Sequence, residues 1–152
     1  MVVAKQRFGL GQVVRDAKVE AGRRGDRRIG TEHVLLALLV DPDSVPARAL
    51  GVSLHSAGDA LRALDRQALA AVGVSLPATD LGTAHPERRR LMLTPGAVAV
   101  FKGLGKLSRG ERLGVQHVLL ALLARERPDP AAELFDALGV DRADVRRRLA
   151  SP

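Results

Sequence analysis

An internal repeat constrains the fold of this chain more than any other feature. Residues 30–39 read GTEHVLLALL and residues 114–123 read GVQHVLLALL, so eight of the ten aligned positions are identical. The repeat extends further, because the letters ALGV follow at 49–52 and again at 137–140. Self-similarity at this separation indicates that the chain uses one supersecondary unit twice.

The composition predicts that each unit is built from helices. Hydrophobic residues make up 46% of the chain and aromatic residues 2%, with no Trp and no Tyr. A core of Leu, Val and Ala favours helices packed on helices, since strand-forming residues other than Val are scarce. Apolar residues also recur at helical spacing before each copy of the repeat. They are Leu10, Val13, Val14, Ala17 and Ala21 in the first half, and Val98, Phe101, Leu104 and Leu107 in the second.

Helix-start signals divide each half into four helices. Ser, Thr and Asp are favoured at the position before a helix, and Pro is favoured at its first position. The predicted N-caps are Thr31 (before a helix from Glu32), Ser44, Ser53, Thr94, Asp129 and Asp141. The apolar run VLLALL has no polar side, so we expect it to form a central, enclosed helix in each half.

The predicted fold is therefore all-α, with two four-helix repeats related by a pseudo-twofold axis. One such unit buries little apolar surface alone, so we expect the two to pack as a single eight-helix domain over residues 1–152. Repeat one spans about 7–72 and repeat two about 93–150. The stretch 73–92 between them holds Gly, Pro, Ser and Thr without a sustained period, and we expect it to be a surface connector.

The chain is strongly basic, with a formal net charge of +7. Arginine clusters at 23–24, 27–28, 88–90 and 146–148 can attract nucleic acid or acidic partners. No aromatic platform or nucleic-acid-reading motif accompanies them, and we interpret the clusters as solvated helix faces and loops. A basic nucleic-acid-binding protein stays open as an alternative, and it would show a steep salt dependence of affinity.

Several classes of activity lack their motifs. There is no cysteine, no HExxH, no GxSxG and no phosphate-binding GxxxxGK[ST], so we expect no enzyme activity, no cofactor and no metal site. His33 and His117 occupy equivalent positions, and we interpret them as buried side chains that bond to the chain. The longest apolar stretch, Val34 to Val40, is too short to span a bilayer. With no apolar run typical of a signal peptide at the start, we expect a cytoplasmic protein.

The two copies of the repeat differ at their first polar positions. Thr31 and Glu32 in the first copy correspond to Val115 and Gln116 in the second. A helix N-terminus presents unpaired N–H groups and a partial positive charge, and is therefore an anion site. Thr31 adds a hydroxyl and Glu32 a carboxylate, so a ligand with both a phosphate and a guanidinium would suit them. The plainer alternative is that Thr31 caps the helix and Glu32 interacts with its dipole.

These motifs together resemble the Clp N-terminal domain, the double-repeat module at the front of Clp-type unfoldases such as ClpA and ClpC. The resemblance rests on residues 29–39 and their second copy, on Thr94 and the Pro that follows it, and on the two ALGV segments. It covers about residues 7–150. The resemblance implies an all-helical, pseudo-twofold domain of eight helices that recruits substrates and docks adaptor proteins.

The resemblance also implies a ligand. ClpC-type domains of Gram-positive bacteria bind phosphorylated arginine, a degradation tag, with the Glu of each GTEH motif on the guanidinium and nearby Thr and backbone groups on the phosphate. By motif match, Thr31 and Glu32 form the first such site. Val115 and Gln116 form a degenerate second site that lacks the hydroxyl and the carboxylate.

The function expected from the sequence is that of a non-enzymatic protein-binding module. No ATPase motif follows the repeats, so we expect the chain to act as an adaptor or a decoy for a Clp unfoldase rather than to unfold clients itself. Its partners would be a Clp unfoldase or its clients, in part through phosphoarginine, with no membrane, and with nucleic acid only under the alternative given above. A further alternative is sequestration of Clp-targeting peptide antibiotics in the groove between the repeats.

Overall fold

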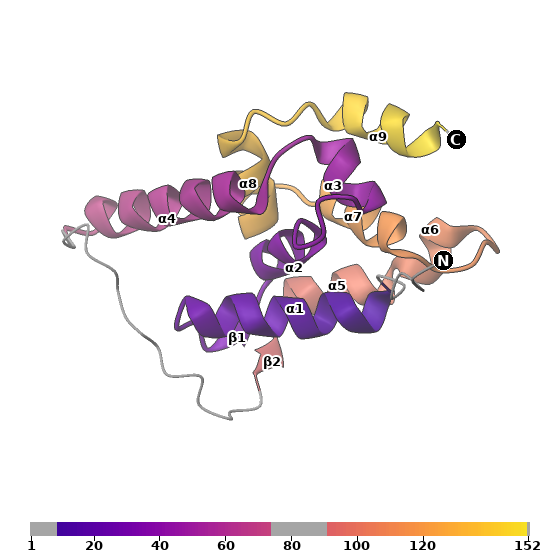
Figure 1. Cartoon of the computed structure of the whole chain (residues 1–152). Helices are drawn as coiled ribbons and strands as arrows, with labels where there is room; N and C mark the ends of the chain where they lie inside the picture. The colour runs from indigo at the N-terminus through magenta and orange to yellow at the C-terminus, as the bar shows by residue number, and fades with distance from the viewer. Residues whose placement is uncertain (1–8, 74–90, 152) are drawn as a thin grey trace, which may run out of the picture.

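The computed structural model describes residues 9–73 and 91–151, and over these ranges the chain forms nine helices and one pair of short strands (Figure 1). The first half contains α1 (Leu10–Arg23), β1 (Arg28–Ile29), α2 (Thr31–Leu38), α3 (Val45–Leu50) and α4 (Leu54–Ala71). The second half contains β2 (Met92–Leu93), α5 (Pro95–Lys102), α6 (Leu104–Ser108), α7 (Val115–Leu123), α8 (Pro130–Ala137) and α9 (Arg142–Ala150). The predicted all-α fold is confirmed.

The two copies of VLLALL form the centre of the molecule. In α2, every residue from Val34 to Leu38 is at most 1% exposed. In α7, Val118, Leu119 and Leu122 are fully buried, and Leu120 is half-buried. The two helices also contact each other. The enclosed position predicted for the repeated segment is therefore confirmed, and it explains why these apolar residues are the same in both copies.

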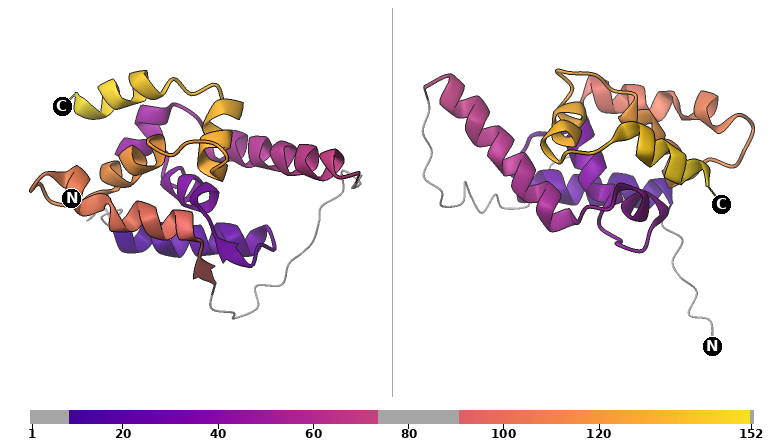
Figure 2. Two further views of the ribbon diagram at one scale, coloured as in Figure 1. Left: turned by 180° about the vertical axis from the view of Figure 1, so that it is seen from behind. Right: turned by 90° about the horizontal axis from the view of Figure 1, so that it is seen from above.

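Each half contributes a helix that packs on the other half across the centre of the molecule. Helix α8 of the second half packs on α2 and α4 of the first, while α3 of the first half packs on α7 and α9 of the second (Figure 2). The residue with the largest fully buried side chain, Phe135, comes from α8. The apolar core is consequently one cluster shared by both halves. Beyond this core, α4 extends outward as an arm (Figure 1).

Most of the predicted helix starts are confirmed by hydrogen bonds. Ser44, Ser53, Thr94 and Asp141 each accept the backbone N–H three residues along, and Asp129 accepts that of the residue two along. These bonds satisfy N–H groups that a helix start otherwise leaves without a partner. Helix α3 ends where Gly51 adopts a left-handed conformation with φ of 68°, a common helix stop that favours glycine.

Three expectations about the second half and the connector need correction. The helix from Pro95 divides into α5 and α6 at Gly103. Of its predicted apolar residues, Leu104 is buried, Val98 and Phe101 are half-buried and Leu107 is exposed, whereas Ala97 and Val100 are buried although they were not predicted. The sequence analysis missed the parallel pairing of β1 with β2. The predicted connector therefore ends inside a strand at Met92, and the rest of it, residues 74–90, lies outside the described ranges.

The arginines of α9 are not all solvated. Arg146 donates to the carbonyl of Leu123 at 3.1 Å, and Arg148 donates to the carbonyl of Ala49 at 2.8 Å. Both carbonyls lie near helix C-termini, where cations and N–H donors are favourable. Part of the positive charge of the chain therefore stabilises helix ends and ties α9 to α3. In the described ranges, no helix has the length and apolar character needed to cross a bilayer.

Candidate ligand-binding site

Helix α2 begins at Thr31, one residue earlier than the sequence analysis predicted. Its N-cap is Gly30, which has an extended backbone with φ of −98°. The N-cap role assigned to Thr31 is therefore wrong. A Cβ on Gly30 would overlap the carboxylate of Glu32, which folds back over the helix start. Gly114 has the same relation to Gln116 in the second repeat.

His33 supplies the cap that the Gly30 position lacks. Its Nδ1 accepts the backbone N–H of Gly30 at 2.9 Å, and its Nε2 lies 2.7 Å from Oδ2 of Asp26. This pattern requires the ring proton on Nε2, donated to the carboxylate. His117 repeats the first bond, accepting from Gly114 at 3.0 Å. The structural interpretation of both histidines is confirmed: they hold the helix starts of the two repeats.

Thr31 is engaged across the interface between the repeats. The residue is 1% exposed, its hydroxyl donates to Oδ1 of Asp129 at 2.6 Å, and it accepts the backbone N–H of Ala131 at 3.2 Å. Asp129 also accepts from Nε of Arg125 at 2.9 Å. Thr31 thus joins the start of α2 to the start of α8. Its hydroxyl is already occupied as donor and as acceptor.

The Thr31 contact explains half of the difference between the two copies. By the pseudo-twofold relation, Val115 faces α3, and α7 does contact that helix. The N-cap of α3, Ser44, donates its hydroxyl to the carbonyl of Leu38 within its own repeat. A hydroxyl at position 115 would have no equivalent of Asp129 to bind, and Val115 is accordingly buried at 8% exposure.

Glu32 is a carboxylate held largely out of water at a helix start. Its side chain is 17% exposed. Burial raises the pKa of Glu32 above its ordinary value, and the nearby His33 opposes this only in part. Within the described ranges, Glu32 forms no ion pair with an arginine or lysine, and Oε1 lies 3.2 Å from Nδ1 of His33. A carboxylate in this situation favours an added cation.

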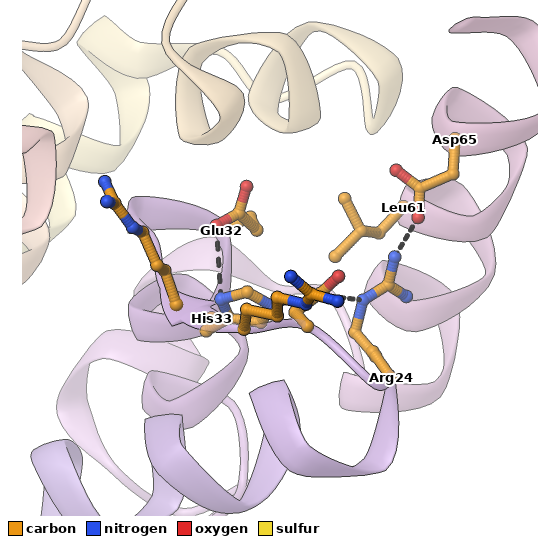
Figure 3. Close-up of a pocket in the computed structure, with 8 residues that line it drawn as sticks. Arg24, Glu32, His33, Leu61 and Asp65 are labelled. Carbon is orange, nitrogen blue, oxygen red and sulfur yellow. Dashed lines mark hydrogen bonds and ion pairs between the residues drawn. The ribbon is translucent and has the colours of Figure 1, made fainter. Parts of the chain in front are cut away.

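A pocket of about 310 Å³ opens beside Glu32, between the end of α1, β1 and α4 (Figure 3). Arg24 forms an ion pair there with Asp65, and its Nε lies 3.4 Å from Oδ2 of Asp26, so these two carboxylates balance its charge. Burial raises the pKa of Asp26, but its hydrogen bond and charge interaction with His33, with help from Arg24, bring the net pKa below the ordinary value. For Asp65, burial outweighs Arg24 and the pKa is raised.

Two further arginines line this pocket. Arg27 and Arg28 are exposed, and neither forms an ion pair with the described carboxylates. Besides Arg24, the pocket is therefore lined by two arginines that pair with no described carboxylate, together with the carboxylate of Glu32. This arrangement matches a ligand that carries an anion and a cation a few ångströms apart.

Glu32 also borders a second hollow on its other side. This hollow, of about 390 Å³, lies between the starts of α2, α5 and α8. It is lined by Thr31 and Glu32 from the first half, and by Thr94 and Arg125 among others from the second. The structure thus brings Thr31 and Glu32 to one wall, but only Glu32 also reaches the pocket with Arg27 and Arg28.

The second repeat offers no carboxylate at the matching place. Gln116 is half-buried and folds over Gly114 as Glu32 folds over Gly30. The carboxylate of Glu111 lies 3.9 Å from Nε2 of His117, and its side chain is 78% exposed. The two starts share their backbone geometry and differ in charge.

Sequence reasoning missed the residues that surround Glu32. Arg24, Asp26 and Asp65 form one ion-pair group, yet Asp65 lies 41 positions from Arg24. The signal available was the arginine-rich segment before the first repeat, which was interpreted as solvent-exposed. In the described ranges, no group of three or more His, Asp or Glu side chains is placed to hold a metal ion.

The sequence and the fold of the chain are both similar to those of known proteins. No family model matches the chain. The chain is 32% identical to the ATP-binding subunit ClpC of the Clp protease from Staphylococcus epidermidis, over 93% of the chain and 16% of that protein. Among solved structures, the N-terminal domain of ClpD from Arabidopsis thaliana aligns with 91% of the chain and 90% of its own length, with a TM-score of 0.65 and 15% identity.

A second solved structure gives the same fold. The N-terminal domain of Hsp104 from Candida albicans aligns with 95% of the chain and 89% of its own length, with a TM-score of 0.56 and 16% identity. The chain spans only 14 to 16% of the length of the first curated relatives that it matches. The aligned part of those relatives is their N-terminal region. The chain belongs to the family of Clp N-terminal domains.

Proposed function

We propose that this chain is a protein-binding module of a Clp unfoldase or protease system. Its similarity to ClpC covers the N-terminal region of that protein and not an ATPase module. The role proposed is to bind client proteins and deliver them to an unfoldase as an adaptor, or to withhold them as a decoy. No chemical step is assigned to the chain.

We further propose that its clients carry phosphorylated arginine and that the first repeat reads this tag. The observation that carries the proposal is that Glu32, Arg27 and Arg28 line one pocket. The guanidinium of phosphoarginine would lie on the carboxylate of Glu32, and its phosphate on the two arginines. The raised pKa of Glu32 supports this assignment, since a bound cation would offset the cost of burying the charge.

Thr31 takes a different part in this proposal than the motif match implied. Its hydroxyl bonds to Asp129 and Ala131, so we assign it to positioning the start of α2 rather than to holding the phosphate. The degenerate second site at Val115 and Gln116 lacks both the hydroxyl and the carboxylate. We therefore propose one site per chain.

Calorimetric titration with free phosphoarginine tests the site. The expected result is binding with a stoichiometry of one, lost in Glu32→Ala and retained in Gln116→Ala, the matched change in the second repeat. Free arginine and phosphoserine serve as ligand controls, because the side chain of arginine lacks the phosphate and that of phosphoserine lacks the guanidinium. Equal binding by both variants would show that the carboxylate of Glu32 does not read the ligand.

A degradation assay separates the two roles within a Clp system. An arginine-phosphorylated client is incubated with a Clp unfoldase, its protease and increasing amounts of this chain. An adaptor accelerates loss of the client, and a decoy slows it. An effect of equal size on the unphosphorylated client would contradict tag recognition while leaving protein binding intact.

A further inference from the structure

The C-terminal end of α2 borders a groove in the first repeat. The groove has a volume of about 280 Å³ and lies between the ends of α2, α3 and the start of α4. Its walls are mainly apolar. They include Leu39, Val40, Pro42, Ala47, Val52 and Leu54.

The internal repeat shows what occupies the equivalent place in the second half. The N-caps Ser53 and Asp141 start matching helices, so Leu54 corresponds to Arg142. Arg142 donates to the carbonyls of Arg125 at 3.0 Å and Ala132 at 3.3 Å, and its guanidinium lies 5.6 Å from the ring centre of Phe135. An arginine side chain therefore fills this position in repeat two.

A second arginine completes the arrangement in repeat two. Arg146, one turn further along α9, donates to the carbonyl of Leu123 near the end of α7. The equivalent position in α4 is Gly58, and no atom lies within 4 Å of where its Cβ would be. The first repeat thus has neither arginine: Leu54, which packs against the apolar core, stands at the first position, and the space around a Cβ on Gly58 is open at the second. No described side chain donates to the carbonyl of Leu39, the equivalent of Leu123.

The charge around the groove suits a cation. Asp41 and Asp43 flank Pro42 in the loop that forms one wall, and neither pairs with an arginine or lysine in the described ranges. The end of α2 adds the partial negative charge of its carbonyl groups.

We propose that this groove binds an unphosphorylated arginine side chain presented by a partner protein. The aliphatic stem would pack on the apolar walls, and the guanidinium would bond to carbonyl groups at the end of α2, as Arg142 and Arg146 do for α7. The partner segment would carry apolar residues beside the arginine, to cover exposed Val40 and Val45. The site goes beyond the proposed phosphoarginine pocket, which lies at the other end of α2.

A short labelled peptide tests the groove. The probe is a capped pentapeptide with a central arginine between leucines, followed by fluorescence anisotropy, and its control has glutamine at the centre. The expected result is preference for the arginine peptide by about tenfold, the size of effect that one good charged contact produces. The preference should persist in Glu32→Ala, which separates the groove from the phosphoarginine pocket. Equal binding of the two peptides would overturn the proposal.

A variant that fills the groove from within provides the second arm. Gly58→Arg restores the arginine of repeat two at a helical position with open space, and it also removes a helix-weakening glycine. It should weaken binding of the arginine peptide by about tenfold. The matched control, Gly105→Arg, adds the same charge at another open helical glycine and should leave binding unchanged. Leu54→Arg repeats the test at the second position.

Two outcomes would overturn this assignment. One is a correctly folded Gly58→Arg protein that binds the arginine peptide as well as the unaltered chain does. The other is self-association in sedimentation equilibrium that Gly58→Arg abolishes, which would make the occupant a second copy of this chain. In either case, calorimetry with phosphoarginine still reports on the Glu32 pocket alone.

Discussion

Single residues explain why the two copies of the repeat differ where they do. Thr31 bonds to Asp129 of the other half, whereas Val115 is buried at the start of α7, and the cap of α3 bonds within its own repeat. Glu32 carries a charge that its surroundings do not neutralise fully, whereas Gln116 carries none. The first difference belongs to the interface between the repeats, and we propose that the second belongs to ligand binding.

The charge of Glu32 should lower the stability of the free chain. Burial raises the pKa of Glu32 in the folded chain, so folding favours its neutral form. The stabilisation that protonation of Glu32 provides is complete at a pH below its pKa in the unfolded chain, and it is lost as the pH rises through its pKa in the folded chain. Glu32→Gln should therefore raise the free energy of unfolding at neutral pH by up to about 1 kcal/mol. Near about pH 4 the gain should shrink, since Glu32 is then largely protonated.

Thermal unfolding at the two pH values checks this prediction. The matched control is Gln116→Glu, which introduces the charge into the second repeat and should destabilise the chain at neutral pH. A Glu32→Gln protein that is less stable than the unaltered chain at neutral pH would contradict the proposed electrostatic cost.

The hydrogen bond between Thr31 and Asp129 should couple the two halves. Thr31→Val removes the hydroxyl that donates the hydrogen bond. Asp129→Asn removes the negative charge of the carboxylate that accepts it. A double-mutant cycle measured by denaturant unfolding should give a coupling energy of about 1 kcal/mol, as for other buried hydrogen-bonded pairs. Strict additivity of the two changes would mean that the contact adds nothing to stability.

At the scale of elements, the helix starts could be predicted from the sequence, but the hydrogen bonds that side chains make from one helix to another could not. Ser44, Ser53 and Asp141 cap as predicted because capping is local and each partner lies within three residues. The bond of Arg148 to Ala49 spans 99 positions, and the sequence has no local signal for it. The break at Gly103 also depends on packing, since Gly103 keeps a right-handed helical conformation.

The arginine triplet of α9 allows a matched comparison between neighbours. Both Arg147 and Arg148 pair with Asp144 of their own helix, but among the described residues only Arg148 of these two also donates to a carbonyl at the end of α3, while the Arg147 side chain is 73% exposed. Arg148→Ala should lower the free energy of unfolding by about 1 kcal/mol, and Arg147→Ala should change it by less than about 0.5 kcal/mol. Chemical denaturation of both variants measures this, and equal losses would refute the helix-tying role of Arg148.

For the whole molecule, the repeat predicts the architecture but not the way in which the halves interlock. The duplicated VLLALL segment correctly indicated two central helices. The sequence alone does not reveal that α8 packs on α2 and α4, or that α3 packs on α7 and α9. The pocket at Glu32 is formed within the first half, where folding brings together residues of α1, β1, α2 and α4 that lie up to 41 positions apart.

The exchange of helices predicts that neither half folds alone. Separate fragments covering 9–73 and 91–151 would each expose the apolar face that the other covers. Far-UV circular dichroism should show little helix in either fragment and recovery of helix when the two are mixed. A single fragment with a cooperative unfolding transition would contradict the idea of one shared core.

The central claim is that the start of α2 in the first repeat, and not its copy in the second, binds phosphoarginine. Amide chemical shifts recorded during titration with phosphoarginine test this residue by residue. We expect saturable shifts around Glu32, Arg27 and Arg28, with those around Gln116 unchanged. Shifts centred on Gln116, or none at either helix start, would contradict the claim.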